Sequence, residues 1–205
     1  MAILDGNAEG TSAMIAASPE LATAYFHTGA SRASEKPHFF AQISRYLYAG
    51  DTALHIAAAA YQSMIVEQFI KAGADVRARN RFGYMPLHSA AAGIPGSQYW
   101  NPARQAATIR VLIKSGADPN STDKRGVTPL HIAVRTRCSL AAQTLLECGA
   151  DPAQKNKNGS DAMLLAVCTT GRGGSGSPEA KQEQQQIVQL LRQCGIREPR
   201  AVRIR

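Results

Sequence analysis

The fold of this chain is decided by residues 126–158, which read GVTPLHIAVRTRCSLAAQTLLECGADPAQKNKN. The stretch predicts two short helices and a turn. Thr128 can cap the first helix, because its hydroxyl can accept a hydrogen bond from an otherwise unpaired N–H of the first turn, and Pro129 suits the first helical position. Alanine and leucine at helical spacing predict the second helix at about 140–147. Gly149 then ends it, because glycine adopts left-handed backbone at little steric cost.

Two earlier stretches repeat this pattern in register. Each copy opens with glycine and ends its first motif in leucine-histidine, in GDTALH (50–55), GYMPLH (83–88) and GVTPLH (126–131). Each copy ends its second helix at Gly-Ala-Asp, at residues 73–75, 116–118 and 149–151. These segments resemble the ankyrin repeat, whose signature is T-P-L-H-x-A at a period of about 33 residues. The resemblance spans residues 50–195 and implies an all-α solenoid of stacked helix-turn-helix units joined by short β-turns.

One elongated domain is expected, because each repeat buries its apolar face only against its neighbours. The repeats are predicted at 50–82, 83–125, 126–158 and 159–195. Residues 1–49 are predicted to cap the array. They contain a degenerate copy of the motif at 10–17, with Ser12 at the helix-capping position, a second helix at 18–26 and a further helix at 37–48. Residues 196–205 form a basic tail with four arginines.

Two repeats are lengthened between their helices. In the second repeat the extra segment, 93–102, contains Trp100, the only tryptophan, and its prolines predict an ordered loop. Met85 replaces the capping threonine of this repeat, at a predicted cost of roughly 1 kcal/mol. In the fourth repeat the extra segment is 169–178, and Ser177 is predicted to cap the helix that follows.

Charge and cysteine content indicate the partners and the compartment. Lys and Arg number 23 against 15 Asp and Glu, a net charge of +8, and this basic balance favours acidic partners. No apolar run reaches the length of a membrane span, and the first residues lack the basic segment of a secretory signal. The four cysteines include no C-x-x-C pair and are interpreted as mostly core-filling, which fits a reducing cytoplasm. A cytoplasmic monomer without a membrane partner is expected.

The histidines of the repeated motif, His55, His88 and His131, recur at one structural position. We interpret them as bridges between backbone groups of adjacent turns. They are not accompanied by a nucleophile elbow or a zinc-binding H-E-x-x-H motif. The sequence therefore predicts a non-catalytic protein with no metal and no cofactor.

Ankyrin arrays usually bind other proteins, so the resemblance implies a protein–protein interaction module. One candidate surface is formed by the two long inter-helix segments, which are expected to project from one edge of the stack and to flank the short turn of the third repeat. Aromatic residues and arginines have the composition of an interaction hot spot, and those expected here are Tyr99, Trp100, Arg104, Arg135, Arg137 and Arg172. In the alternative interpretation the segments pack on each other and Trp100 fills a gap.

A second candidate surface is the row of turns between repeats. Stacking would align their basic residues as a ridge, with the three arginines of the first turn on one face. The residues are Arg77, Arg79, Arg81, Lys124, Arg125, Lys155 and Lys157. Together the two surfaces predict an acidic protein partner. Two alternatives are nucleic-acid binding through the ridge and tail, and a small anionic ligand held between the long segments.

Overall fold

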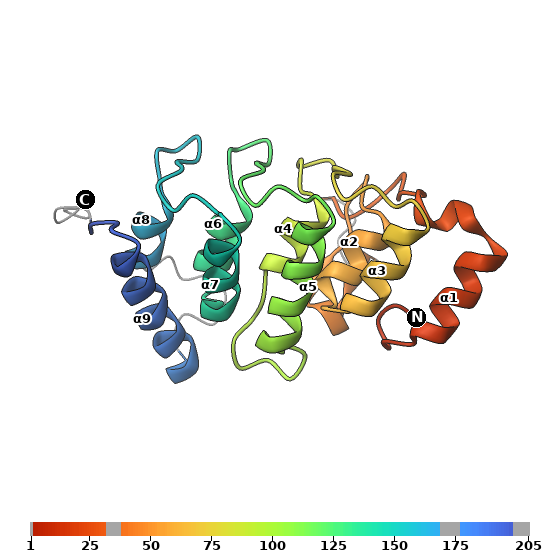
Figure 1. The fold of residues 1–205 in the computed structure, drawn as a ribbon, viewed down its shortest axis with the longest axis horizontal. Helices are drawn as coiled ribbons and strands as arrows, with labels where there is room; N and C mark the ends of the chain where they lie inside the picture. Colours follow the sequence, from red (N-terminus) through yellow and green to blue (C-terminus); the bar gives the residue numbers. More distant parts are fainter. Residues whose placement is uncertain (1, 32–37, 169–176, 199–205) are drawn as a thin grey trace.

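Stacked helix pairs make up the chain in the computed structural model, which describes residues 2–31, 38–168 and 177–198 (Figure 1). The α-helices within these ranges are α1 (Ala8–Ala17), α2 (Ala53–Ala59), α3 (Ser63–Lys71), α4 (Pro86–Ala91), α5 (Pro102–Lys114), α6 (Pro129–Arg135), α7 (Ser139–Glu147), α8 (Ala162–Val167) and α9 (Pro178–Gln193). The shorter elements are the 3-10 helices η1 (Pro19–Ala22) and η3 (Ala41–Ile43) and the strands β1 (Phe39–Phe40) and β2 (Arg45–Tyr46).

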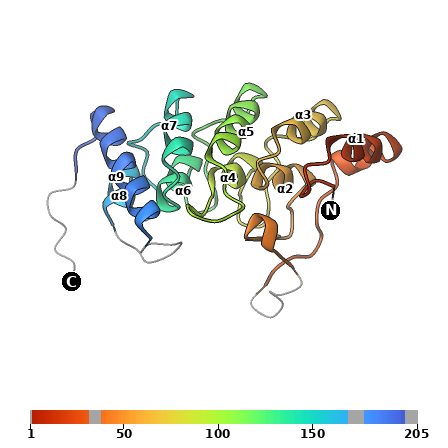
Figure 2. The ribbon, with the colours of Figure 1, turned by 90° about the horizontal axis from the view of Figure 1, so that it is seen from below.

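The helices form two rows. The first helices of the repeats, α2, α4, α6 and α8, pack side by side, and the second helices, α3, α5, α7 and α9, form the other row with α1 beside α3 (Figure 2). The core lies between the rows. Each repeat contributes one fully buried side chain four residues after its opening glycine, namely Leu54, Leu87, Leu130 and Met163. The predicted all-α repeat solenoid is confirmed.

Local capping sets the helix bounds much as the sequence predicts. Thr128 Oγ1 accepts from the N–H of His131 at 3.2 Å, and Ser177 Oγ accepts from the N–H of Ala180 at 3.1 Å. The Gly-Ala-Asp glycines end α3, α5 and α7 in left-handed backbone, with φ of 94° at Gly73, 97° at Gly116 and 91° at Gly149. Met85 gives α4 no side-chain cap.

The extra residues of the second repeat are divided between a loop and a helix. The loop spans 92–101, and α5 has 13 residues where α3 and α7 have 9. The loop is ordered, as predicted, by two turns, in which the N–H of Ser97 donates to Ile94 O at 3.0 Å and that of Trp100 to Ser97 O at 3.1 Å. The extra segment of the fourth repeat lies outside the described residues, except for its last two residues, 177 and 178.

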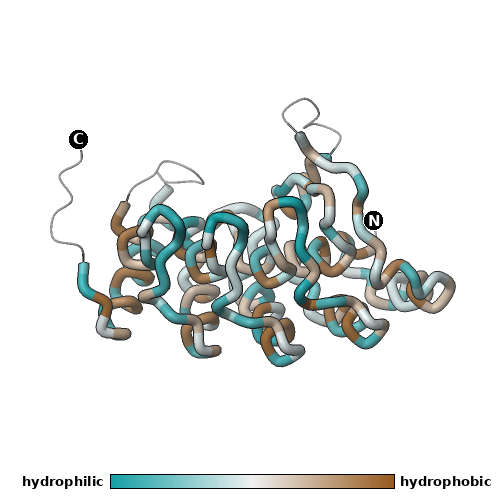
Figure 3. Tube along the Cα trace, turned by 90° about the horizontal axis from the view of Figure 1, so that it is seen from above, coloured by the Kyte–Doolittle hydropathy of each residue, from teal (hydrophilic) through white to brown (hydrophobic). Residues whose placement is uncertain are grey.

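The turns between repeats form a ladder along one edge of the stack, with mostly hydrophilic tips (Figure 3). One backbone N–H of each turn donates to a carbonyl of the preceding turn or segment, in the pairs Arg81 to Ala49 (2.8 Å), Lys124 to Phe82 (3.0 Å) and Lys157 to Arg125 (2.9 Å). The close approach depends on glycine, since a Cβ on Gly83 would lie 3.0 Å from Lys124 N. The alignment of the turns that a basic ridge requires is therefore present.

The first helix of the N-terminal segment differs from the prediction. Helix α1 begins after Asn7, whose side chain accepts from the N–H of Gly10 at 2.8 Å. Ser12 consequently lies inside the helix and does not cap it. The predicted second helix at 18–26 is reduced to the single 3-10 turn η1, which packs against α2.

The predicted helix at 37–48 is wrong for the part that the structure describes. From residue 39 the chain forms a hairpin, in which β1 and β2 pair antiparallel with Phe39 opposite Tyr46. The two rings are 5.0 Å apart, and a cross-strand aromatic pair stabilises a hairpin. Ser44 takes left-handed backbone, φ 47°, which the interior of a right-handed helix does not accommodate, so one helix cannot run through 37–48.

The cysteines do not form a set of core residues. Cys138 is fully buried, whereas Cys148 is half-buried, and Cys168 and Cys194 are exposed. The last three each follow the final residue of a helix, α7, α8 and α9 respectively. The interpretation of most cysteines as core-filling is therefore wrong, and it holds for Cys138 alone.

Candidate functional site

The motif histidines bridge neighbouring turns, as predicted. Nδ1 of His131 accepts the backbone N–H of Thr128 at 3.0 Å, and its Nε2 lies 3.0 Å from Gln154 O in the next turn. Because an amide N–H can only donate, Nδ1 must be unprotonated, and Nε2 carries the proton and donates it to the carbonyl. His55 and His88 repeat this geometry toward Tyr84 O (3.0 Å) and Val127 O (3.1 Å).

Burial keeps these imidazoles neutral. It lowers the pKa of His88 to about 4 from its ordinary value of 6.5, and it lowers the pKa values of His55 and His131 as well. In each case loss of hydration of the charged form is the largest cause. All ring nitrogens of the three residues are engaged within the fold, which leaves them a structural role.

A groove opens on the side of the stack formed by the first helices. Its volume is about 390 Å³. It is lined by η3 and β2 of the hairpin, by residues of α2, α4 and α6, and by the loop after α4. We call this cavity the hairpin groove. It joins three parts of the chain that are far apart in sequence.

The hairpin groove is aromatic and cationic. Its rings are Tyr46, Tyr48, Tyr61, Tyr84, Tyr99 and Trp100, and its charged side chains are Arg45 and Arg135. Of the described residues that line it, none is acidic. Within the described ranges neither arginine forms an ion pair, although the guanidinium of Arg45 lies 5.9 Å from the ring centre of Tyr84. The groove therefore has the chemistry of a site for negatively charged groups with apolar parts.

Trp100 forms a wall of the groove and also holds the loop in place. Its Nε1–H donates to Gln105 Oε1 at 3.0 Å, and Gln105, fully buried, donates to Ala90 O at 2.9 Å. The ring packs over Gly93, where an added Cβ would lie 2.8 Å from Trp100 Cδ1 and 2.7 Å from Cys138 Sγ. A partner can contact the ring but not the indole N–H, because that proton is already donated.

The structure brings only part of the predicted loop cluster together. Tyr99, Trp100 and Arg135 line the hairpin groove. Arg104 lies outside it and donates to the side chain of Gln62. Arg137 is only 7% exposed, with left-handed φ of 60°, and it does not line the groove, so the structure does not bring it together with Arg135 as a second arginine of the predicted floor. Arg172 lies outside the described residues, as does most of the second wall.

The basic residues of the turn ladder fall into two groups. In the first, the side chains brace the turns. Arg79 donates to Thr122 O in the next turn at 2.7 Å, whereas the guanidinium of Arg81 lies over Tyr48 in the preceding segment, 5.2 Å from its ring centre. The two arginines reach in opposite directions along the stack, so the prediction that the three arginines share one face is wrong.

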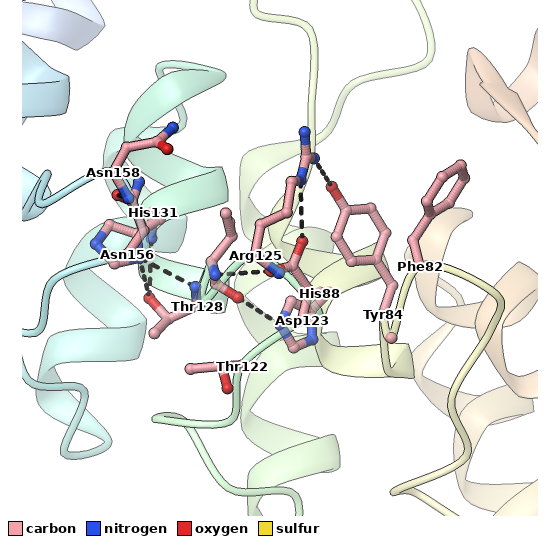
Figure 4. A network of polar contacts seen from close by, with 12 residues as sticks. Phe82, Tyr84, His88, Thr122, Asp123, Arg125, Thr128, His131, Asn156 and Asn158 are labelled. Atoms are coloured by element: carbon pink, nitrogen blue, oxygen red, sulfur yellow. Dashed lines mark hydrogen bonds and ion pairs between the residues drawn. The ribbon is translucent and has the colours of Figure 1, made fainter.

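Arg125 also belongs to the bracing group (Figure 4). It lies 3.7 Å from the buried carboxylate of Asp123 and 3.4 Å from the hydroxyl of Tyr84. Oδ1 of Asp123 accepts two backbone N–H groups at 2.7 Å, which closes the turn. In the second group, the exposed side chains make no hydrogen bond or ion pair within the described ranges, and its members are Arg77, Lys124, Lys155 and Lys157.

Sequence reasoning missed the hairpin and the floor of the groove. The sequence predicts a helix at Arg45 and Tyr46, where the structure has strand β2, and no sequence pattern marks Ser89 on α4 as a lining residue. A weak signal was available, since four aromatic residues lie between 39 and 48 without a consistent helical face. The sequence does not show which of these aromatic residues line the groove beside α4, because that is set by the way the hairpin folds back onto the stack.

The fold defines the class of protein first, a solenoid of helix pairs with a ladder of turns and a groove on its first-helix side. The model for ankyrin repeats (three copies) matches residues 102–199, and the model for the single ankyrin repeat matches residues 49–81. Together these matches cover more than half of the chain, which belongs to the ankyrin-repeat family. Neither match includes 82–101, which hold α4 and the long loop.

Members of this family are in general protein–protein interaction modules and typically act without catalysis. A comparison with curated proteins gave no match. In the described ranges, no cluster of three or more His, Cys, Asp or Glu side chains has the arrangement of a metal site. None of the helices there is both long and apolar enough to cross a bilayer.

Proposed function

We propose that this protein is a non-catalytic interaction module that binds an acidic segment of a partner protein across the turn ladder and the hairpin groove. The proposal rests chiefly on one observation. Exposed cations without an acidic partner in the described ranges, Lys124 and Lys157 among them, stand on one edge of the stack, next to a groove with no acidic lining residue. Tyr84 joins the two surfaces, because its ring lines the groove and its hydroxyl contacts Arg125 of the ladder.

The charges are placed to select a partner more than to stabilise the fold. Exposed lysines contribute little to folding, whereas complementary charge accelerates association and excludes basic partners. The aromatic and arginine side chains of the groove have the composition that contributes most of the binding free energy at interfaces. An extended acidic segment bearing an apolar residue satisfies both surfaces.

Selection from a displayed library of random peptides on the immobilised full-length chain tests this function. Selected peptides should be enriched in Asp and Glu. The double variant Lys124→Glu/Lys157→Glu should weaken the best peptide about tenfold or more, or about 1.4 kcal/mol. The control Arg104→Glu/Lys181→Glu changes the same charge at exposed positions outside the ladder and the groove, and should leave affinity nearly unchanged.

Two results would contradict the proposal. Peptides without acidic enrichment would remove the acidic partner, and equal losses in both double variants would show that net charge alone matters. Random single-stranded oligonucleotides provide the comparison for nucleic acid. If they bind more tightly than the peptides at physiological salt, with a steep salt dependence, the ridge is a nucleic-acid surface instead.

A further inference from the structure

The floor of the hairpin groove holds a polar group that the fold leaves without a partner. Ser89 on α4 is 1% exposed, and its Oγ has no hydrogen-bond partner within the described residues. The same residue lines the groove. A buried hydroxyl without a partner costs about 1–3 kcal/mol. A ligand in the groove that accepts a hydrogen bond from this hydroxyl would remove the cost.

The walls around Ser89 present aromatic ring faces to the groove, and the polar atoms of Tyr61 and Trp100 are already hydrogen-bonded within the fold. The rings of Tyr84 and His88 stack at 5.5 Å with an angle of 10° between their planes. The hydroxyl of Tyr61 donates to Ala92 O, and the indole N–H of Trp100 to Gln105. What these residues offer to the groove is therefore ring surface, which favours a planar apolar body.

The cations of the groove supply the complementary polar end. Arg45 comes from the hairpin and Arg135 from the end of α6, so the groove is cationic on two sides. A volume of about 390 Å³ lies in the range of small-molecule sites, roughly 300–1,000 Å³. Such sites are mostly apolar, with a few polar groups that fix orientation. The hairpin groove combines all of these features.

We propose that the hairpin groove is a binding site for a small aromatic carboxylate. Its ring lies against the aromatic walls, its carboxylate pairs with Arg45 and Arg135, and Ser89 donates a hydrogen bond to it. This site goes beyond the proposed protein-binding function and does not depend on it, because the ladder lysines take no part. A small ligand in the groove would occupy the space that the apolar residue of the partner segment takes in the proposed function, so the two would compete for the groove.

Calorimetric titration of the full chain with 2-naphthoate tests the site, with 2-naphthylmethanol as the same ring without the charge. The acid should bind at least about tenfold more tightly than the alcohol. Arg45→Gln and Arg135→Gln should each weaken the acid about tenfold and leave the alcohol nearly unchanged. Arg104→Gln, which removes an exposed arginine outside the groove, should change neither.

Ser89→Ala separates a ligand contact from a structural role. The free protein should keep or gain stability in this variant, because the substitution removes an unpaired hydroxyl, while the acid should bind several-fold more weakly. Backbone and indole N–H shifts of the parent protein on titration with 2-naphthoate should change around Ser89, Gly93 and Trp100. Equal affinity for acid and alcohol, absence of binding, or shifts confined to other repeats would overturn the proposal. The Lys124→Glu/Lys157→Glu variant should still bind the acid, so failure of the protein-binding function is distinguishable from failure of this one.

Discussion

At the scale of single residues, the histidine of the repeated motif connects each repeat to the next. In the third repeat Thr128 Oγ1 accepts from the N–H of His131 and contacts its Nδ1 at 3.0 Å, while Nε2 reaches Gln154 O in the following turn. The imidazole must stay neutral to accept at Nδ1. The same groups therefore couple the stacking of the repeats to pH.

The buried His88 makes this coupling measurable. Its folded pKa of about 4 lies below the ordinary 6.5, so the unfolded chain binds more protons between these values. The stabilisation is complete above pH 6.5 and is lost as pH falls toward 4, by up to roughly 3 kcal/mol. Urea unfolding should thus show a falling free energy of unfolding from neutral pH to about pH 5.

Substitution of His88 checks the source of this slope. His88→Gln should be less stable at neutral pH and lose less stability on acidification. His55 and His131 have lowered pKa values too, so part of the slope should remain. The exposed His27 provides the control, His27→Gln, which should keep the parent's slope. A slope identical in His88→Gln and the parent would refute the assignment.

The residues of the candidate site were predictable only in part. Of the residues that line the groove, the sequence predicts Tyr99, Trp100 and Arg135 as candidates, because the length of the loop and the shortness of the α6–α7 turn are visible in the repeat alignment. It could not separate Arg135 from Arg137, two positions apart. Their burial differs because Arg137 takes left-handed backbone in the turn. The sequence does not indicate this conformation, because the residue that usually marks it is glycine and this position holds arginine.

At the scale of elements, helix α9 of the fourth repeat supplies the N-terminal cap of helix α7 in the third repeat. Cys138 precedes α7 and provides no side-chain cap. Instead Glu183 of α9 accepts the N–H of Ser139 at 2.7 Å, and Gln186 accepts its hydroxyl at 2.7 Å. A carboxylate at a helix N-terminus satisfies an unpaired donor and complements the helix dipole. The cap of α7 is thus supplied by its neighbour.

Removal of this carboxylate should weaken the contact between the two repeats. Glu183→Ala is expected to lower the free energy of unfolding by about 1 kcal/mol, and Glu183→Gln by less, because the amide oxygen can still accept. Gln185→Ala, at an exposed position of the same helix, serves as the control in chemical denaturation. Equal effects of Glu183→Ala and Gln185→Ala would show that the cap contributes nothing.

Elements with a helical period were predictable, and elements without one were not. The pairs α2–α3 and α6–α7 follow from capping residues, apolar spacing and terminal glycines. The hairpin does not, because Phe39, Ile43 and Leu47 also fit a helical spacing, and only the pairing of Phe39 with Tyr46 decides between the two forms. That pairing involves residues on opposite sides of a left-handed Ser44, a contact that a local pattern does not specify.

At the scale of the whole molecule, the two ends of the stack are sealed to different degrees. Helix α1 buries only Thr11, whereas α9 buries Ala180, Ile187 and Leu191. Large apolar side chains remain exposed at the N-terminal end, where Met14 is 53% and Phe26 41% exposed. In a solenoid each repeat is stabilised by its neighbours, so an end with a weak seal opens first.

Hydrogen exchange followed by mass spectrometry should therefore rank the helices along the stack. Exchange is expected to be fastest in α1 and slowest in α4–α7, which have neighbours on both sides. Leu130→Ala, in the middle, should cost about 2–5 kcal/mol and accelerate exchange in α4, α6 and α8 together. Leu191→Ala, at the end, should accelerate exchange in α7, α8 and α9 while α2 and α3 stay protected. If both variants accelerate α2 and α3 equally, the array unfolds as one unit, and the stepwise coupling inferred from its geometry is wrong.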